Sequence, residues 1–285
     1  MPRANRSFIP GHIWHVTHRA HKQEFLLRFR KDKRCWTRWA IEAKRRYGLA
    51  ILNFMITSNH VHLLVMALAS TARSAKGVPG VRGAARSCLA FSRALQLIES
   101  RVAETYNARK GRDGAFWDDR YHATAIETGL QLARCLTYID MNMVRAGVVG
   151  HPRDWPWCGY HELGREVEGP PVERRRSFVV DTEALLDLVG VPDPAALLAR
   201  RSEWIDAAIR KGRLEREAFW TESVAVGSEG FLEAFQSQIG RRLGVAEICK
   251  DEADTDLFYL RRTRGNPIVV FGGKNEDLRP KKAPQ

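Results

Sequence analysis

Two histidines separated by one residue, His60 and His62, form the pair with the clearest chemical potential in the sequence. They stand in an apolar, β-branched run that predicts a strand, and residues i and i+2 of a strand share one face. Two imidazoles on one face can ligate a cation and leave positions open for phosphate oxygens and water. On spacing alone an ordinary packed or surface pair is the commoner interpretation, and a metal site needs a third ligand from elsewhere.

Tyr138 and Asn142 form a second pair, four residues apart in a helix expected over residues 129–146. Side chains at this spacing lie on one helix face, and an interior asparagine is intrinsically unfavourable there. A phenol can attack phosphorus to give a phosphotyrosine ester, which conserves the energy of the phosphodiester for rejoining. The alternatives are a core tyrosine bonded to a carbonyl and an asparagine that faces solvent or caps the helix.

Alternating strands and helices would position these residues. Periodicity predicts strands over 11–19, 49–57, 60–66 and 115–126, and helices over 31–47, 87–106 and 129–146. This order predicts an α+β fold in which helices cover a mainly antiparallel sheet.

The second half of the chain has a different composition. Residues 164–177 are rich in Gly, Glu, Pro and Arg, which predicts a linker, and helices are predicted over 182–188, 193–211 and 228–243. We therefore expect a catalytic domain over 1–163, a linker over 164–177, a helical C-terminal module over 178–260 and a partly disordered tail over 261–285. The module is expected to have a packing or specificity role.

The positive charge is confined to the first half of the chain. Residues 1–150 carry 25 Lys and Arg against 10 Asp and Glu, whereas the remainder carries 21 against 23. Such a field fits a polyanionic partner, because neutralised phosphates release counterions, although solubility is the simpler alternative. Five cysteines without a CxxC pair argue against a disulfide framework or a zinc finger. No apolar run fits a signal peptide or a membrane span, so we expect a cytoplasmic protein with no membrane partner.

Several stretches, in order along the chain, resemble one known family. Residues 56–65, ITSNHVHLLV, resemble the NHxHLLV signature of the single-tyrosine HUH transposases, also called the REP-associated tyrosine transposase group. Residues 138–147, YIDMNMVRAG, look like the group's YIxxNxVRAG helix. Three shorter similarities support this. Residues 106–107 with 114–121 resemble the group's YN…GxxWxxRY stretch, residues 14–17 its first strand, and residues 154–157 the segment after its tyrosine helix. The sequence departs from the pattern at Thr57-Ser58 and Met143, where Met-Pro and Pro are frequent.

The resemblance implies a ferredoxin-like HUH nuclease domain that cuts and rejoins single-stranded DNA at hairpin-type ends. By position, His60, His62 and Asn142 would bind Mg²⁺ or Mn²⁺, and Tyr138 would form a 5′-phosphotyrosine intermediate. No small-molecule cofactor is implied, and the protein would act at the nucleoid in the cytoplasm. Some members build the centre across a dimer and others act alone, so a homodimer is left open.

Basic residues are candidates for contact with DNA. We expect Arg120 and Arg145 to contact phosphates. A small, glycine-containing loop over 70–87 supplies four further candidates for gripping a strand or hairpin, namely Arg73, Lys76, Arg82 and Arg86. Taken singly, each is more often a solvated surface charge.

Other residue types compete for the same assignments. Tyr121 and Tyr160 are rival nucleophiles, but neither has a polar partner four residues on. Four N-terminal histidines resemble a metal cluster, namely His12, His15, His18 and His21. On a strand His12 and His18 face away from His15, so we expect structural or DNA-contacting roles for them.

Two other functions stay open. One is a catalytically silent DNA- or RNA-binding protein on the same scaffold. The other is a metal-dependent nuclease in which the site at His60 and His62 activates water and Tyr138 is structural.

Overall fold

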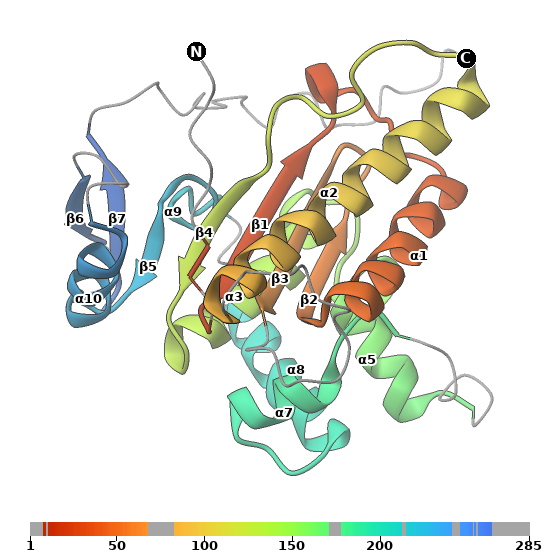
Figure 1. Ribbon diagram of the computed structural model, residues 1–285. Coiled ribbons are helices and arrows are strands. Elements are labelled where there is room, and N and C mark those ends of the chain that lie inside the picture. The colour runs from red at the N-terminus through yellow and green to blue at the C-terminus, as the bar shows by residue number, and fades with distance from the viewer. Residues whose placement is uncertain are drawn as a thin grey trace, which may run out of the picture.

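One seven-stranded sheet organises the computed structural model (Figure 1). The structure describes residues 8–9, 11–67, 83–170, 178–212, 215–240, 246–252, 254 and 256–263, with the backbone alone at 67 and 83–88. The strands are β1 (Ile13–Arg19), β2 (Leu49–Ile56), β3 (His60–Ala67), β4 (His122–Ile126), β5 (Ala225–Gly227), β6 (Ala246–Lys250) and β7 (Phe258–Arg262). The helices are α1 (Arg30–Tyr47), α2 (Gly83–Lys110), α3 (Leu130–Asp140), α4 (Asn142–Arg145), α5 (Gly159–Glu168), α7 (Thr182–Val189), α8 (Pro194–Arg210), α9 (Phe219–Glu222) and α10 (Glu229–Ile239), with short 3-10 helices η1 (His21–Gln23) and η2 (Pro152–Asp154). Within this part of the chain, no helix combines the length and apolarity that a membrane crossing needs.

The first four strands have the ferredoxin-like arrangement. The chain runs β1-α1-β2-β3-α2-β4, and the strands lie in the order β2-β3-β1-β4 with every neighbouring pair antiparallel. This confirms the predicted α+β fold, the helix over 31–47 and the strands over 49–57 and 60–66. Gly48 ends α1 with φ 64°, a left-handed conformation that glycine adopts at little steric cost.

Helices cover both faces of these four strands. α1 and α2 pack against each other on one face (Figure 1), where Trp36 and Val61 line one small cavity. α3 lies on the opposite face, where Tyr138 approaches His62. The alternation along β3 therefore separates the core residue Val61 from His60 and His62.

The C-terminal helices are present where they were predicted, but strands join them that were not. α7, α8 and α10 confirm the helices over 182–188, 193–211 and 228–243, the last as far as Ile239; residues 241–243 lie outside the described residues. β5 pairs in parallel with β4, β7 pairs with β5, and β6 pairs with β7. The C-terminal part thus extends the sheet of the first four strands, and the division into domains stays a prediction. β5 has only three residues, too few for a periodic signal.

Two predicted elements in the first half are wrong in extent. The strand over 115–126 is confined to β4, because Phe116 enters the core and the Trp117 indole donates to the Glu99 carbonyl of α2. α2 begins at Gly83, inside the loop expected over 70–87, and residues 70–82 of that loop lie outside the described residues.

The expected linker and tail also contain regular structure. α5 runs through the first residues of the linker, because Glu162 accepts hydrogen bonds from the backbone N–H groups of Val179 and Val180 and ties the helix to α7. β7 includes Arg261 and Arg262, which the sequence placed in the tail.

The single helix expected over 129–146 is two helices. α3 ends at Asp140 and α4 begins at Asn142, with Met141 between them at ψ −2°. The Arg145 Nη2 donates to the Tyr138 carbonyl at 2.6 Å. In a continuous helix that carbonyl would accept from the N–H of Asn142, so the arginine replaces the main-chain bond.

Candidate active site

β1 and β3 place His60 and His62 beside further polar side chains. In their antiparallel pairing, Arg19 stands opposite His60 and Thr17 opposite His62. The centroids of the two imidazoles are 5.0 Å apart, on one face of β3. His60, at the strand end, is half-buried, whereas His62 is 3% exposed.

Local contacts fix the proton on the His60 ring. Its Nδ1 is 2.8 Å from Asn59 Oδ1 and 2.9 Å from Thr57 Oγ1. The Asn59 amide nitrogen donates to the Gln23 carbonyl, so Oδ1 faces the ring and can only accept. His60 Nδ1 therefore carries the proton, and Nε2 keeps a lone pair for a ligand.

α3 and α4 bring Tyr138 and Asn142 to the histidines. The Tyr138 side chain is 5% exposed, and its ring centroid is 6.2 Å from that of His62. Asn142 Nδ2 is 3.0 Å from His62 Nε2. The four residues to which the sequence assigned the chemistry therefore meet in one place and come from one chain.

Arginines make this place electropositive. The Arg145 guanidinium lies over the Tyr138 ring, 4.2 Å from its centroid. Burial, reinforced by Arg19, Arg216 and Arg145, lowers the pKa of His60 to about 3. Burial is also the main cause that lowers the pKa of His62 well below its usual value. Both rings are therefore neutral, which is the form that ligates metals.

The same environment acts on the tyrosine hydroxyl. Burial raises the pKa of Tyr138, while the charges of Arg145 and Arg216 oppose that rise. The phenol is therefore protonated at neutral pH, and the two arginines stabilise negative charge that forms on it.

The donor atoms fit a divalent cation with an incomplete protein shell. His60 and His62 can each offer Nε2, and Asn142 can offer its amide oxygen after the amide turns over. This set leaves positions for phosphate oxygens and water. Among the described residues, no group of three or more His, Cys, Asp or Glu side chains could hold a metal, and the Asn142 amide beside His62 is the third candidate donor.

A C-terminal segment that the sequence did not implicate covers this site. Trp220 of α9 is 1% exposed, and its ring centroid is 6.0 Å from that of Tyr138. The Trp220 carbonyl is 2.9 Å from His15 Nδ1 on β1. Three residues on, the Ser223 carbonyl lies 2.8 Å from His122 Nε2 of β4. The segment thus reaches β1 and β4 through main-chain groups.

His15 and Arg19 were also missed as neighbours of the histidine pair. Strand alternation places both on the face of β1 that His62 shares on β3, so pairing of the two strands was a usable signal. Nothing local in the sequence marks Trp220 as the partner of His15.

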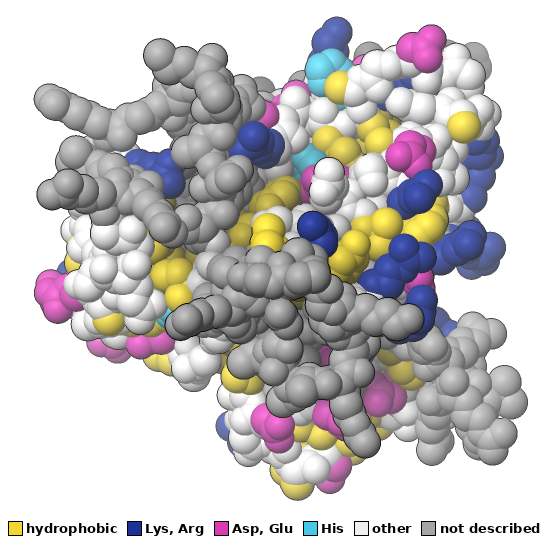
Figure 2. All heavy atoms as spheres, viewed as in Figure 1, with side chains coloured by type: hydrophobic (Ala, Val, Ile, Leu, Met, Phe, Trp, Pro, Cys, Tyr) yellow, Lys and Arg dark blue, Asp and Glu magenta, His cyan; other side chains and the backbone are white. Residues whose placement is uncertain are grey.

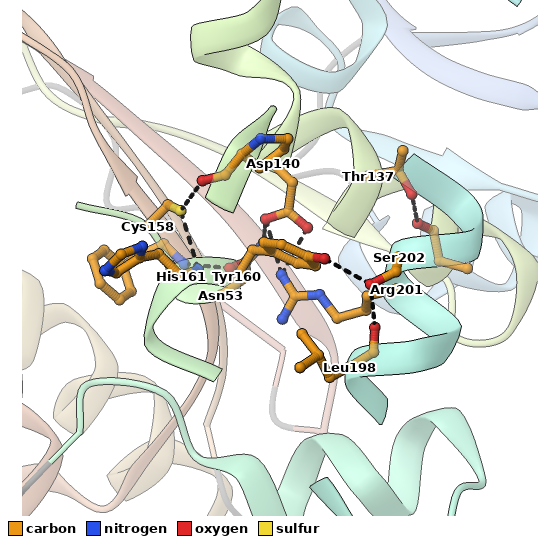
Figure 3. Close-up of polar contacts among 12 residues, drawn as sticks. Asn53, Thr137, Asp140, Cys158, Tyr160, His161, Leu198, Arg201 and Ser202 are labelled. Carbon is orange, nitrogen blue, oxygen red and sulfur yellow. Dashed lines mark hydrogen bonds and ion pairs between the residues drawn. The ribbon is translucent and has the colours of Figure 1, made fainter. Parts of the chain in front are cut away.

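A buried ion pair joins α8 to the end of α3 (Figure 3). The Arg201 Nη2 donates to the two Asp140 oxygens at 2.9 and 2.7 Å, and each residue is 1% exposed. Asn53 of β2 donates to the same carboxylate at 2.9 Å. The Tyr160 ring lies 5.6 Å from the guanidinium carbon. This network anchors the tyrosine helix to the C-terminal part of the chain.

The candidate DNA contacts divide into two groups. Arg145 lies in the site, and Arg120 is exposed in the segment before β4. The loop candidates are not placed, because the side chain of Arg86 and all of Arg73, Lys76 and Arg82 lie outside the described residues.

Of the competing tyrosines and histidines, His15 contacts His62 in the site, whereas Tyr121, Tyr160, His12 and His18 have partners elsewhere. Tyr160 belongs to the ion-pair network, and Tyr121 is near Phe8. His18 stacks on Trp117 on the other face of the sheet, and His12 bonds to Gln238.

Basic side chains gather over α1, away from the histidines. Figure 2 shows Lys and Arg concentrated at the right, over α1, and Asp and Glu at the bottom, over α7 and α8. α1 contains eight Lys and Arg against two acidic residues. Because α1 covers the sheet face opposite the site, this patch does not form a wall of the site.

Known proteins give distant likenesses. No family model and no curated protein matches the sequence. One similar solved structure is a REP-associated tyrosine transposase bound to a REP hairpin, with 21% identity, a TM-score of 0.42, and coverage of 64% of this chain and 94% of that chain. Another is a putative transposase from Deinococcus radiodurans R1, with 12% identity, a TM-score of 0.29, and coverage of 48% and 95%. Both are transposases by name, and at these TM-scores neither likeness is evidence for the activity of this chain.

Proposed function

We propose that this protein is a transposase-like, metal-dependent transesterase that cuts and rejoins single-stranded DNA. The supporting observation is that Tyr138, two neutral histidines and an asparagine side chain converge in one electropositive site. A phenol beside such a donor set suits attack on phosphorus with departure of an oxyanion.

In the proposed cleavage, the Tyr138 oxygen bonds to phosphorus as the bond from phosphorus to the 3′ oxygen breaks. The products are a 5′-phosphotyrosine ester and a 3′-hydroxyl, which takes up through solvent the proton that the phenol loses. Attack of a 3′-hydroxyl on the ester reverses the step and rejoins the strands. His60, His62 and Asn142 would hold Mg²⁺ or Mn²⁺, which when bound polarises the scissile phosphate and stabilises the leaving oxygen.

An unpaired strand or a hairpin end is the substrate we propose. Tyr138 and His62 are 5% and 3% exposed, so a scissile phosphate must come close to largely buried side chains, which an unpaired strand does more readily than a duplex. Arg19, Arg145 and Arg216 would then attract the phosphate. One chain supplies every side chain of this centre, and a homodimer stays a prediction.

One observation favours a second candidate, a metal-dependent nuclease that uses water. Burial raises the pKa of the Tyr138 hydroxyl, and the Arg145 guanidinium packs on the ring, both of which also suit a structural tyrosine. In that case water at the site of His60 and His62 would attack the phosphate.

Adduct formation distinguishes these functions. The protein is incubated with labelled hairpin DNA carrying a single-stranded flank and with Mn²⁺, and the products are resolved on a denaturing gel. Wild type is expected to form a covalent protein–DNA adduct and Tyr138→Phe none. Tyr160→Phe is the matched control and should keep the adduct, because the Tyr160 hydroxyl bonds to Ser202 Oγ at 2.7 Å and phenylalanine keeps the ring beside Arg201.

The other outcomes are equally specific. Cleavage without an adduct would support the water-using nuclease. An undiminished adduct in Tyr138→Phe would make the assigned nucleophile wrong. Binding without cleavage of any substrate tried would support the catalytically silent DNA-binding protein.

A further inference from the structure

His15 lies between the C-terminal segment and a histidine of the proposed metal site. Its Nδ1 is 2.9 Å from the Trp220 carbonyl, and its Nε2 is 2.9 Å from His62 Nδ1. His15 is 0% exposed, so no solvent competes for these contacts. The two imidazole planes differ by 15° and the ring centroids are 5.1 Å apart. With a nitrogen–nitrogen distance of 2.9 Å, this separation places the rings edge to edge, as an in-line N–H···N bond requires.

The direction of the two hydrogen bonds follows from the atoms involved. A carbonyl can only accept, so His15 Nδ1 carries a proton and donates it to Trp220. The remaining nitrogen of a neutral His15 can only accept, so His62 Nδ1 carries a proton and donates it to His15. His62 Nε2 is then left with a lone pair, directed at the Asn142 amide 3.0 Å away.

The opposite tautomers do not fit. A proton on His62 Nε2 would require His15 to donate from Nε2, and the lone pair of His15 Nδ1 would then face the Trp220 carbonyl oxygen at 2.9 Å. His60 reaches the same tautomer by a separate route, through Asn59 within its own turn. The two proposed ligands therefore depend on different parts of the chain.

We infer that His15 is a positioning residue that relays the hydrogen-bond direction of the Trp220 carbonyl to His62, so that the C-terminal segment sets the metal-binding tautomer of a histidine on β3. This inference rests on the proposed function in one respect, the treatment of His62 as a ligand. Partners that hold the second nitrogen of a ligating histidine fix its tautomer and orientation, and their loss lowers metal affinity roughly 10- to 100-fold.

The tautomers themselves can be measured without metal. In metal-free protein labelled with ¹⁵N at histidine, long-range ¹H–¹⁵N correlation spectra at neutral pH are expected to show His15 and His62 protonated at Nδ1, with signals assigned by single substitutions. Protonation of His62 at Nε2 in the wild type would overturn the inference, whatever the protein does to DNA.

Metal affinity provides the second readout. Binding of Mn²⁺ alone, followed by the electron paramagnetic resonance of the free ion, is expected to weaken roughly 10- to 100-fold in His15→Phe. His15→Gln should stay within about threefold of wild type, because the amide can donate to Trp220 and accept from His62. His122→Phe is the matched control: His122 lies against another carbonyl of the same segment, that of Ser223 three residues on, and its loss should leave Mn²⁺ affinity unchanged.

The outcomes separate this inference from the proposed function. Wild-type affinity in a folded His15→Phe would overturn the relay and leave the proposed function intact. Equal weakening in His15→Phe and His15→Gln would also overturn it, because the amide would then fail to replace the ring. Nδ1 tautomers in a wild type that neither binds Mn²⁺ nor forms an adduct would support the relay and contradict the proposed function.

Discussion

The two parts of the chain that meet at the site contribute different kinds of atoms. The strands and helices before residue 170 provide the proposed nucleophile and the proposed metal ligands, and the first 150 residues hold the whole excess of positive charge. The described residues after 178 contribute the charge of Arg216, which acts on His60 and Tyr138. They also contribute the main-chain carbonyls of Trp220 and Ser223 and the buried guanidinium of Arg201. The first part therefore depends on residue identity, whereas much of the second depends on the path of its backbone. A segment without a recognisable motif can thus form part of the candidate site.

Deleting residues 178–285 is expected to have the largest effect. α8 packs on α3, and α9 packs on β4. The deletion therefore exposes apolar groups of α3 and β4 and leaves Asp140 without Arg201. The free energy of unfolding is expected to fall by about 5 kcal/mol or more, which is comparable with the whole stability of a typical domain. Size-exclusion chromatography and thermal unfolding measure it. A compact truncated chain that melts with wild type and still forms the adduct would mean that the two parts are independent.

Arg201→Met tests the strongest single link between the parts. It leaves the Asp140 carboxylate buried with Asn53 as its side-chain donor, and breaking such a pair costs about 3–5 kcal/mol. Combining it with Asp140→Asn removes the buried charge and should recover part of the loss. Urea unfolding of the two single variants and the double variant gives the coupling energy. No recovery in the double variant would show that the pair does not hold the parts together.

Glu162→Gln tests a weaker link, between α5 and the start of α7. Burial raises the pKa of Glu162 from 4.5 to about 7. Between these values the folded state holds a proton that the unfolded state has lost, so this group makes stability fall as pH rises from 4.5 to 7. The substitution should remove about 1–3 kcal/mol of that fall, seen by urea unfolding at pH 5 and 7.5. Glu183→Gln, at an exposed position of α7, is the control and should show the same fall in the free energy of unfolding between pH 5 and 7.5 as the wild type. If Glu162→Gln also shows the wild-type fall, the pKa of Glu162 is not raised.

Phe29→Ala should have the smallest effect on stability, because it changes an exposed side chain in the first part of the chain. Phe29 is 50% exposed, with Lys110 Nζ 5.7 Å from its ring centroid. The free energy of unfolding should change by less than about 0.5 kcal/mol, while binding of single-stranded DNA weakens, because an aromatic ring beside cations stacks bases. Fluorescence anisotropy measures binding. Leu130→Ala, at a position 56% exposed, is the control, and equal binding by all three proteins would exclude Phe29 from the DNA surface.

The sequence predicted the parts of the site whose signals are local. His60 and His62 share a strand face by spacing alone. Tyr138 and Asn142 lie only four residues apart, so both side chains still reach the site although the helix breaks at Met141. Contacts between distant residues left no such signal. His15 and the Trp220 carbonyl are 205 residues apart, and a main-chain carbonyl has no residue type by which to recognise it. The break itself depends on the Arg145 side chain bonding to a carbonyl seven residues back, which periodicity does not report.

The parallel pairing of β5 with β4 also determines how this protein can associate with itself. In a four-stranded ferredoxin-like sheet β4 would be an edge, with unpaired N–H and C=O groups that can add a strand from another molecule. Here β5, β7 and β6 follow it, and the outermost strand, β6, carries the exposed charges of Glu247 and Lys250. At the other edge, β2 is met by Cys158 and by the N–H of Asp181. Within the described residues both edges are therefore occupied or charged, which disfavours aggregation through strand addition and directs any self-association to helical surfaces.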